Sequence, residues 1–311
     1  MNTFILGDDE MVIGIPRSLF YYRYQTLIKT FFNELDIDYV ISDPSNKKIL
    51  EDGKKLAPDE ACISLKLFLG HLKNLENRCH YILVPRIESV KKDEKVCTNF
   101  YALYDLANNL FDNVIIDINI DETRNNSLKS AFIELGMYFG FSYNKSLCAY
   151  NRAKEKERKI KNNNLLKQTT LLNNNNKKVL LAGHPYNIYD EYLGKPIINI
   201  LKDNGIDVIY SDIYDGKDIE KDVRKISEDV YWTFNKEILG AISKYKDNVD
   251  GIIMLSSFPC GPDSLINELV LRKVKDIPII NIVIDEGESN TGLVTRLESF
   301  IDIINKEKTY E

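Results

Sequence analysis

Cysteine is the residue type of this sequence best suited to chemistry, and three of the five cysteines lie in similar surroundings. Cys62, Cys97 and Cys260 each stand just ahead of a segment with helical character. These helices are predicted over about 64–75, 99–110 and 264–274, in that order. The N-terminal end of a helix carries partial positive charge, which favours the thiolate form of a nearby cysteine. We therefore expect these three side chains to be the reactive ones.

The remaining two cysteines have no comparable position. Cys79 immediately precedes an apolar run that begins at residue 81, which places it at the opposite edge of the predicted sheet. Cys148 enters a charged segment, in SLCAYNRAKEK. We interpret both as small structural side chains without a ligand.

Three thiolates without a fourth indicate a metal centre rather than a single nucleophile. Soft sulfur ligands select zinc, copper(I) or iron–sulfur clusters. A four-iron cluster held by three cysteines leaves one iron open to water or substrate. His184, which follows a predicted strand in LLAGHPYN, would instead complete a Cys₃His zinc site. Three unrelated buried thiols are the third interpretation.

Two segments of the chain resemble each other and predict the elements that position these side chains. Residues 12–43 and 179–212 each consist of an apolar strand, a turn with proline, an amphipathic helix and a second strand ending in Ser-Asp. In the first segment, the apolar positions from Phe20 to Leu35 recur at the spacing of one helix face. Strand–helix–strand with short loops predicts parallel strands, because parallel pairing needs a crossover.

Each half of the chain continues this pattern, so the predicted fold class is α/β, with two Rossmann-like, doubly wound parallel-sheet domains and a cleft between them. The domains are predicted over 11–150 and 178–311, joined by a charged, Asn-rich linker over 151–177. The first domain would supply Cys62 and Cys97, and the second Cys260. One large doubly wound sheet is the alternative. Further strands are predicted over 81–87, 114–118, 251–257 and 277–285, and another helix over 235–247.

Two arginines follow predicted strands on the edge where open α/β sheets bind their ligands. Arg17 stands in GIPRS and Arg86 in VPRIE. At that edge the two arginines would bind the cofactor by neutralising an anionic cluster or holding a phosphate. His184 is the third candidate cofactor-binding residue. The alternative is an ion pair with a local carboxylate. His71 falls late in a predicted helix and is interpreted as a core residue or a residue of the helix C-terminus.

Composition excludes several classes of function. The net charge of −6 argues against nucleic-acid binding, which needs an excess of Lys and Arg. No apolar run reaches the ~18 residues of a membrane span, and the acidic N-terminal residues 1–10 lack the pattern of a signal peptide. An odd number of cysteines in a long chain is typical of a reducing compartment. A cytoplasmic protein without a membrane partner is expected.

An ordered set of motifs, covering nearly the whole chain, resembles the 2-hydroxyacyl-CoA dehydratase superfamily, most closely its acyl-CoA dehydratase activase-related branch. The branch is named as a domain of unknown function. In order, the motifs are IGIPRSLFYY, DEACISLKLFLGH, YILVPR, VCTNFYALYDL, GHPYNIYD, SSFPCGPDS and DEGESNTGLVTRLESF.

The resemblance implies Rossmann-like domains and a [4Fe–4S] cluster, with Cys62, Cys97 and Cys260 at the matching cysteine positions. It also implies an ATP-dependent activase, or another low-potential electron donor, as partner, an acyl-CoA as substrate, and a homo- or hetero-dimer. Related members carry a double-cubane cluster, which two chains would have to share. The chain departs from the family where many relatives have Cys-Pro and it has Cys97-Thr98, and it lacks the GxxxxGK[ST] motif of an ATPase.

These observations predict low-potential electron transfer or reductive dehydration of an acyl-CoA. A non-catalytic assembly or regulatory partner of a dehydratase is the second hypothesis, and a zinc-binding protein the third.

Overall fold

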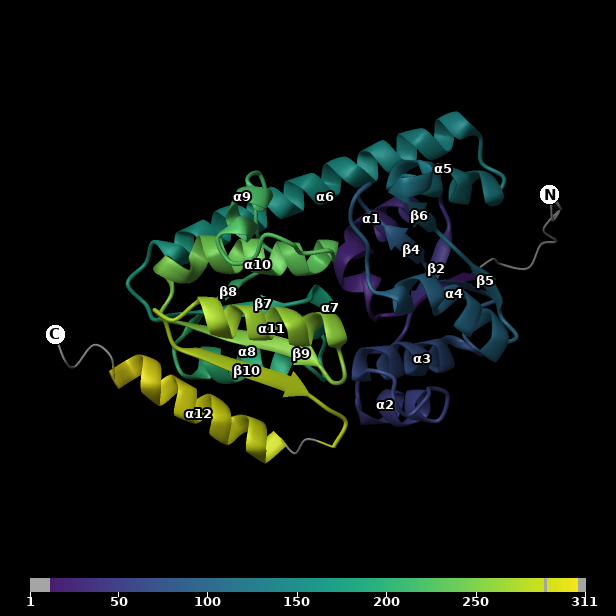
Figure 1. Cartoon of the computed structure of the whole chain (residues 1–311). Coiled ribbons are helices and arrows are strands. Elements are labelled where there is room, and N and C mark those ends of the chain that lie inside the picture. Colours follow the sequence, from purple (N-terminus) through teal and green to yellow (C-terminus); the bar gives the residue numbers. More distant parts are fainter. Residues whose placement is uncertain (1–11, 288–289, 307–311) are drawn as a thin grey trace. The chain divides into compact units, whose positions relative to one another are not determined.

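The computed structural model describes residues 12–287 and 290–306, which form two compact units (Figure 1). The first unit comprises the described residues up to Asp59 together with Leu65–Ile160. The second comprises Glu60–Ser64 and the described residues from Lys161 onward. No helix in this part of the chain is long and apolar enough to cross a membrane. The N-terminal stretch considered for a signal peptide lies outside the described residues.

The first unit is built on a four-stranded parallel sheet in the order β2-β1-β3-β5. Its strands are β1 (Val12–Ile15), β2 (Asp38–Ile41), β3 (Tyr81–Leu83) and β5 (Val114–Ile116). The strand predicted over 81–87 breaks after three residues, because Pro85 has no N–H to donate to a ladder. Arg86 then starts a separate parallel pair, formed by β4 (Arg86–Ser89) and β6 (Asn119–Asp121).

Helices of the first unit pack through large aromatic side chains. Phe31 of α1 meets Phe132 of α5 edge-to-face, with ring centroids 5.1 Å apart, and Tyr150 of α6 lies against Phe132. Both phenylalanines are almost completely buried, which accounts for much of the cohesion of this layer. The helices are α1 (Phe20–Glu34), α2 (Lys47–Lys54), α3 (Ile63–Leu75), α4 (Thr98–Leu110), η1 (Glu122–Arg124), α5 (Leu128–Tyr138) and α6 (Tyr143–Leu172).

The second unit repeats the same strand order along the chain, β8-β7-β9-β10, again with all neighbours parallel. Its strands are β7 (Lys178–Gly183), β8 (Asp207–Tyr210), β9 (Gly251–Ser257) and β10 (Ile279–Ile284). In both units the chain starts in an inner strand, crosses over to one neighbour and then to the other. The predicted pair of doubly wound α/β sheets is therefore confirmed, and the single large sheet is wrong.

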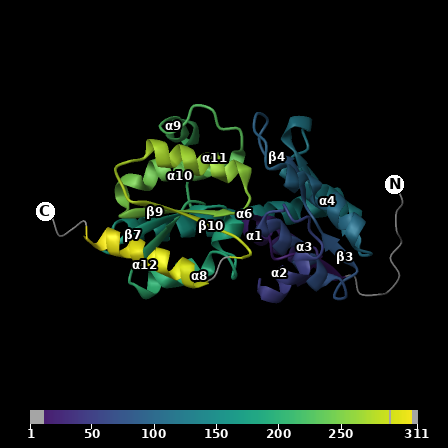
Figure 2. The same cartoon turned by 60° about the horizontal axis from the view of Figure 1, so that its bottom comes forward.

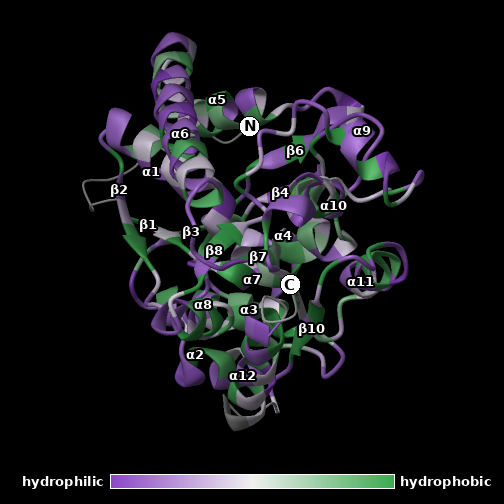
Figure 3. Cartoon of the chain, turned by 90° about the vertical axis from the view of Figure 1, so that its left-hand side faces the viewer, coloured by the Kyte–Doolittle hydropathy of each residue, from purple (hydrophilic) through white to green (hydrophobic). Residues whose placement is uncertain are grey.

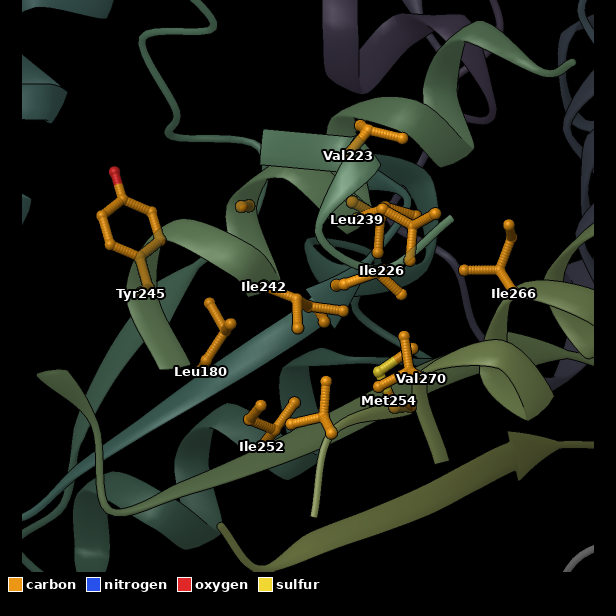
Figure 4. Close-up of a cluster of buried hydrophobic side chains, with 14 of the residues drawn as sticks. Leu180, Val223, Ile226, Leu239, Ile242, Tyr245, Ile252, Met254, Ile266 and Val270 are labelled. Carbon is orange, nitrogen blue, oxygen red and sulfur yellow. The ribbon is translucent and has the colours of Figure 1, made fainter. Parts of the chain in front are cut away.

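Helices cover both faces of the second sheet, with α10 and α11 on one side and α8 and α12 on the other (Figure 1 and Figure 2). The core between the sheet and α10 and α11 contains Leu180, Ile252 and Met254 from the strands and Leu239 and Val270 from the helices (Figure 4). The helices are α7 (Pro185–Ile188), α8 (Lys195–Asp203), α9 (Ile219–Arg224), α10 (Thr233–Tyr245), η2 (Lys246–Asn248), α11 (Gly261–Lys273) and α12 (Asn290–Lys306).

The segment over 151–177, predicted as a linker, continues α6 as far as Leu172 and then turns through the asparagines. Its surface is mostly hydrophilic (Figure 3), with ion pairs such as Lys159–Glu155 one helical turn apart. Buried Gln168 fixes its end to the second unit. The Gln168 side chain accepts from the backbone N–H of Tyr210 at 2.8 Å and donates to the carbonyl of Ile213 at 2.8 Å.

Two glycines let α2 and α3 approach until their backbones touch. A Cβ at Gly70 would lie 1.9 Å from the carbonyl oxygen of Ile49, and one at Gly53 would lie 1.7 Å from that of Lys66. Gly70→Ala is expected to lower the free energy of unfolding by about 1–3 kcal/mol, because backbone atoms must shift to admit the methyl group. Urea unfolding followed by far-UV circular dichroism measures this loss.

Gly261→Ala is the matched control, since a Cβ there meets nothing within 4 Å. Alanine is the better helix former, so the control is expected to match or slightly exceed the wild type. Equal stability of Gly70→Ala and the control would contradict the close approach of α2 and α3.

Candidate functional site

The three cysteines predicted as ligands all occupy the N-terminal ends of thirteen-residue helices. Cys97 is the N-cap residue of α4, Cys260 is the N-cap residue of α11, and Cys62 directly precedes α3. All three side chains are half-buried, and none of the five cysteines, which all lie in the described residues, forms a disulfide. The helix ends favour thiolate at each position.

Cys62 and Cys260 belong to the same unit. The backbone N–H of Ile63 donates to the carbonyl of Phe258 at 3.1 Å, which holds the start of α3 beside the turn after β9. For this reason Glu60–Ser64 groups with the second unit, whereas the sequence placed Cys62 in the first domain. Cys97 lies in the first unit, as expected. Its role as the third ligand stays a prediction.

The turn that carries Cys260 follows the carboxyl end of β9, beside the carboxyl end of β7. The chain passes from β7 to its neighbour β8 on one side and then returns to β9 on the other side, so the strand order changes direction between β7 and β9. In open α/β sheets this point is where ligands bind. The peptide bond between Phe258 and Pro259 is cis. The turn then leads directly into α11, and the hydroxyl and the N–H of Ser264 both donate to the carbonyl of Cys260.

His184 follows β7 at the same edge, as the sequence predicts, and pairs with a carboxylate in the core. Its Nε2 lies 2.8 Å from Oδ1 of Asp263, and both side chains are almost completely buried. Asn235 of α10 donates to the same oxygen at 2.9 Å. The His184 ring stacks on Tyr186 and meets Phe234 edge-on.

Asp263 is ionised at neutral pH despite its burial. Burial, the largest single influence, raises the pKa of this carboxyl group, whereas the electrostatic attraction of His184 lowers it. Hydrogen bonds from His184, Asn235 and Cys260 lower the pKa further, so that it lies below its usual range. A carboxylate only accepts hydrogen bonds, so Nε2 of His184 must carry a hydrogen. Asp263 thus connects His184 with Cys260.

Arg86 is engaged with its surroundings rather than exposed at the sheet edge. One guanidinium nitrogen lies 2.9 Å from Oδ1 of Asp105, and its Nε lies 4.0 Å from Oδ2 of Asp117. The guanidinium also lies over the rings of Tyr101 and Tyr104. These contacts match the local ion pair that was the alternative interpretation.

Arg17 follows β1 and leads into α1 through Leu19, whose φ of 48° lies in a region unusual for leucine. Its guanidinium lies 5.9 Å from the ring centre of Tyr21, and its backbone N–H donates to Oγ of Ser42 at 2.7 Å. Ser42 also contacts His71, so Arg17 stands beside a buried polar cluster of the first unit. Its predicted role in cofactor binding stays a prediction.

His71 is completely buried between two serine hydroxyls. Nδ1 lies 2.8 Å from Oγ of Ser42, and Nε2 lies 2.9 Å from Oγ of Ser45. Burial, reinforced by the charge of Arg17, lowers the pKa of His71 to about 3. The ring is therefore neutral at ordinary pH and serves the core, as the sequence indicates.

The two cysteines without a predicted ligand occupy different surroundings from the other three. Cys79 packs against Gly14 of β1, where an added Cβ would lie 2.5 Å from its sulfur, and its thiol donates to the carbonyl of Leu75. Burial raises the pKa of Cys79 to about 11, which disfavours thiolate. Cys148 lies exposed on α6.

Among the described residues, no three or more His, Cys, Asp or Glu side chains are already grouped to hold a metal ion. The residues present nevertheless fit a thiolate-bound metal in their chemistry: Cys62 and Cys260 offer soft donors at two adjoining helix starts. Sequence reasoning missed Asn187 and Asp263 as parts of this edge. Their signal is a polar side chain in a short proline-containing turn directly after a buried strand, GHPYN after β7 in one case and PCGPDS after β9 in the other.

The chain matches a known protein family over most of its length. The family model described as CoA enzyme activase uncharacterised domain (DUF2229) matches residues 12–213, well over half of the chain. The match includes Cys62, Cys97 and His184 and ends before Cys260. A comparison with curated proteins gives no match.

The solved structures that match this chain share little sequence identity with it. FpvC from Pseudomonas aeruginosa, in complex with Mn²⁺, is 10% identical with a TM-score of 0.33, and the match covers 96% of this chain and 98% of that one. A Zn(II)-bound AdcAII variant from Streptococcus pneumoniae is 12% identical with a TM-score of 0.31, covering 95% and 98%. The laminin-binding adhesin Lmb from Streptococcus agalactiae, in a mutant form, is 10% identical with a TM-score of 0.31, covering 95% and 100%. Likenesses at this level carry no argument about function.

Proposed function

Because the chain belongs to the CoA enzyme activase uncharacterised domain family, we propose that it is an iron–sulfur protein serving acyl-CoA chemistry. The proposed cofactor is a [4Fe–4S]-type cluster bound by the thiolates of Cys62, Cys97 and Cys260. The proposed partner is an ATP-dependent activase or another low-potential electron donor, in the reducing environment of the cytoplasm.

The observation that supports this proposal is the contact between the segment that contains Cys62 and the segment that contains Cys260. These cysteines are almost two hundred residues apart in the sequence, yet a backbone hydrogen bond from Ile63 to Phe258 brings their segments together in one unit. Both precede long helices, and a thiolate at a helix N-terminus is a good ligand for a soft metal. Two thiols without a common ligand are not expected to lie at two helix starts that a hydrogen bond holds side by side.

When bound, such a cluster supplies one-electron transfer at a potential set by its ligands, charge and exposure to water. The residues of this chain would bind and shield it. Asp263 holds His184 at the same sheet edge through the 2.8 Å hydrogen bond, and both side chains are almost completely buried, with Tyr186 and Phe234 against the His184 ring. Low exposure of this kind keeps water away from a reduced centre.

Iron and acid-labile sulfide analysis of anaerobically purified protein, with EPR of the reduced form, tests the proposal. Wild type is expected to contain iron and sulfide in equal amounts. Cys62→Ser, Cys97→Ser and Cys260→Ser are each expected to lose most of both, because a cluster held by three thiolates loses one bond in each variant. Cys79→Ser is the matched control and is expected to retain its metal.

Zinc without sulfide in the wild type would overturn the iron–sulfur proposal in favour of a Cys₃His zinc site. Retention of iron by any of the three serine variants would remove that cysteine from the ligand set. Consumption of a 2-hydroxyacyl-CoA by the protein after reduction by an activase distinguishes a dehydratase component from a non-catalytic partner.

A further inference from the structure

Three buried polar side chains meet in a triangle in the second unit. The hydroxyl of Ser64 donates to Oδ1 of Asn187 at 2.9 Å, and the hydroxyl of Ser257 donates to the same oxygen at 2.8 Å. The two serine oxygens lie 2.6 Å apart. All three residues are almost completely buried, at 4% exposure or less.

The members of this triangle come from three segments that are distant in the sequence. Ser64 is in the first turn of α3, two residues after Cys62. Ser257 ends β9, three residues before Cys260. Asn187 lies in the short helix α7, which directly follows β7 and His184. The amide of Asn187 therefore joins the segment of Cys62 to the segment of Cys260.

Together with the hydrogen bond from Ile63 to Phe258, the triangle fixes the start of α3 at more than one point. One hydrogen bond leaves a segment able to pivot, whereas several bonds in different directions define its orientation. Burial makes these contacts costly to break, because a polar group in the core that loses its partner cannot regain a hydrogen bond from water. The amide nitrogen of Asn187 is itself buried and has no hydrogen-bond partner among the described residues.

We propose that Asn187 is a positioning residue that holds the Cys62 thiol beside the Cys260 thiol, so that the two form a chelating pair for a soft metal centre. This inference rests on the proposed function for the identity of the metal. The geometry of the pair is a property of the metal-free chain and can be tested without any metal.

The test uses full-length protein in which Cys79, Cys97 and Cys148 are replaced by serine, leaving Cys62 and Cys260 as the thiols. The metal-free protein is treated with dibromobimane, a short reagent that becomes strongly fluorescent when it links two thiols. Rapid fluorescence gain, with the cross-link between the two peptides confirmed by mass spectrometry, is expected. Fluorescence of Trp232, the one tryptophan of the chain, reports that the second unit is folded.

Ser64→Ala and Asn187→Leu are each expected to slow the cross-link about tenfold, the factor that corresponds to loss of about one buried hydrogen bond. Ser64→Thr keeps the hydroxyl and is expected to restore the rate. Ser243→Ala is the matched control: Ser243 is also a buried serine of this unit, but its hydroxyl has no partner among the described residues. Its cross-link is expected at the wild-type rate.

Absence of the cross-link in the background protein would overturn the inference, as would an unchanged rate in folded Ser64→Ala and Asn187→Leu. These outcomes are distinct from failure of the proposed function. If the protein cross-links as expected but contains no iron or sulfide, the thiol pair is supported and the proposed cluster is wrong. If the protein contains the cluster but its Asn187 variant cross-links at the wild-type rate, the proposed function is supported and the positioning role of Asn187 is wrong.

Discussion

Replacing His184 with phenylalanine is expected to lower the free energy of unfolding of the second unit by about 3–5 kcal/mol, the range for breaking a buried ion pair by removing one partner. The variant keeps an aromatic ring against Tyr186 and Phe234 but removes the hydrogen that Nε2 shares with Asp263. The carboxylate then lies buried with fewer donors, and its pKa is expected to rise. The loss therefore comes from an uncompensated charge rather than from a cavity.

Urea unfolding at neutral pH, followed by the fluorescence of Trp232, measures this effect. Trp232 is the N-cap residue of α10, in the same unit as the pair. The double variant His184→Phe with Asp263→Leu is the control, because it removes both partners. Its expected loss is smaller than that of His184→Phe alone, since an apolar replacement of a buried pair is often nearly neutral. Equal stability of His184→Phe and wild type would contradict the pairing.

Acidification from pH 7 to pH 5 is expected to cost the first unit about 2 kcal/mol through His71 alone, by linkage of protonation to unfolding. The folded-state pKa of this ring is about 3, whereas the ordinary value in an unfolded chain is 6.5. Between these values the unfolded chain binds a proton that the folded chain does not. Stability is thus fully present above pH 6.5 and falls with decreasing pH, at up to about 1.4 kcal/mol per pH unit.

Urea unfolding followed by circular dichroism at several pH values, in wild type and in His71→Gln, isolates this contribution. Carboxyl groups titrate in both proteins, and the exposed His80 is common to them, so the difference between the two curves belongs to His71. Glutamine can hydrogen-bond to Ser42 and Ser45 but cannot take up a proton in this range. Parallel stability curves in the two proteins would show that the ring is accessible to protons in the folded state.

Much of the fold follows from local patterns in the sequence. The two strand–helix–strand segments over 12–43 and 179–212 both form parallel pairs around a crossover helix. Apolar runs bounded by turn residues are enough to predict the inner strands β1 and β7, because both are largely buried. The three helices that follow Cys62, Cys97 and Cys260 begin within three residues of their predicted starts.

Partnerships between distant side chains could not be read from these patterns. Nothing near Cys62 indicates that its segment bonds to Phe258, because that contact depends on how the chain folds back after α2. The pairing of His184 with Asp263 and the triangle around Asn187 depend likewise on three-dimensional proximity. For Arg86 the position after a strand was predicted, but its partners were not. Asp105 and the two tyrosines that contact its guanidinium lie on α4, and the sequence does not show which way that helix faces.

The shared strand order of the two units places comparable positions at the carboxyl ends of their strands. Arg17 lies two residues beyond β1, and His184 lies one residue beyond β7, the first strand of the second unit. Arg86 and Cys260 each lie three residues beyond the third strand of their unit and directly after a proline. One backbone plan thus presents fixed positive charge in the first unit and sulfur and imidazole in the second, so the same kind of sheet edge offers two different chemistries.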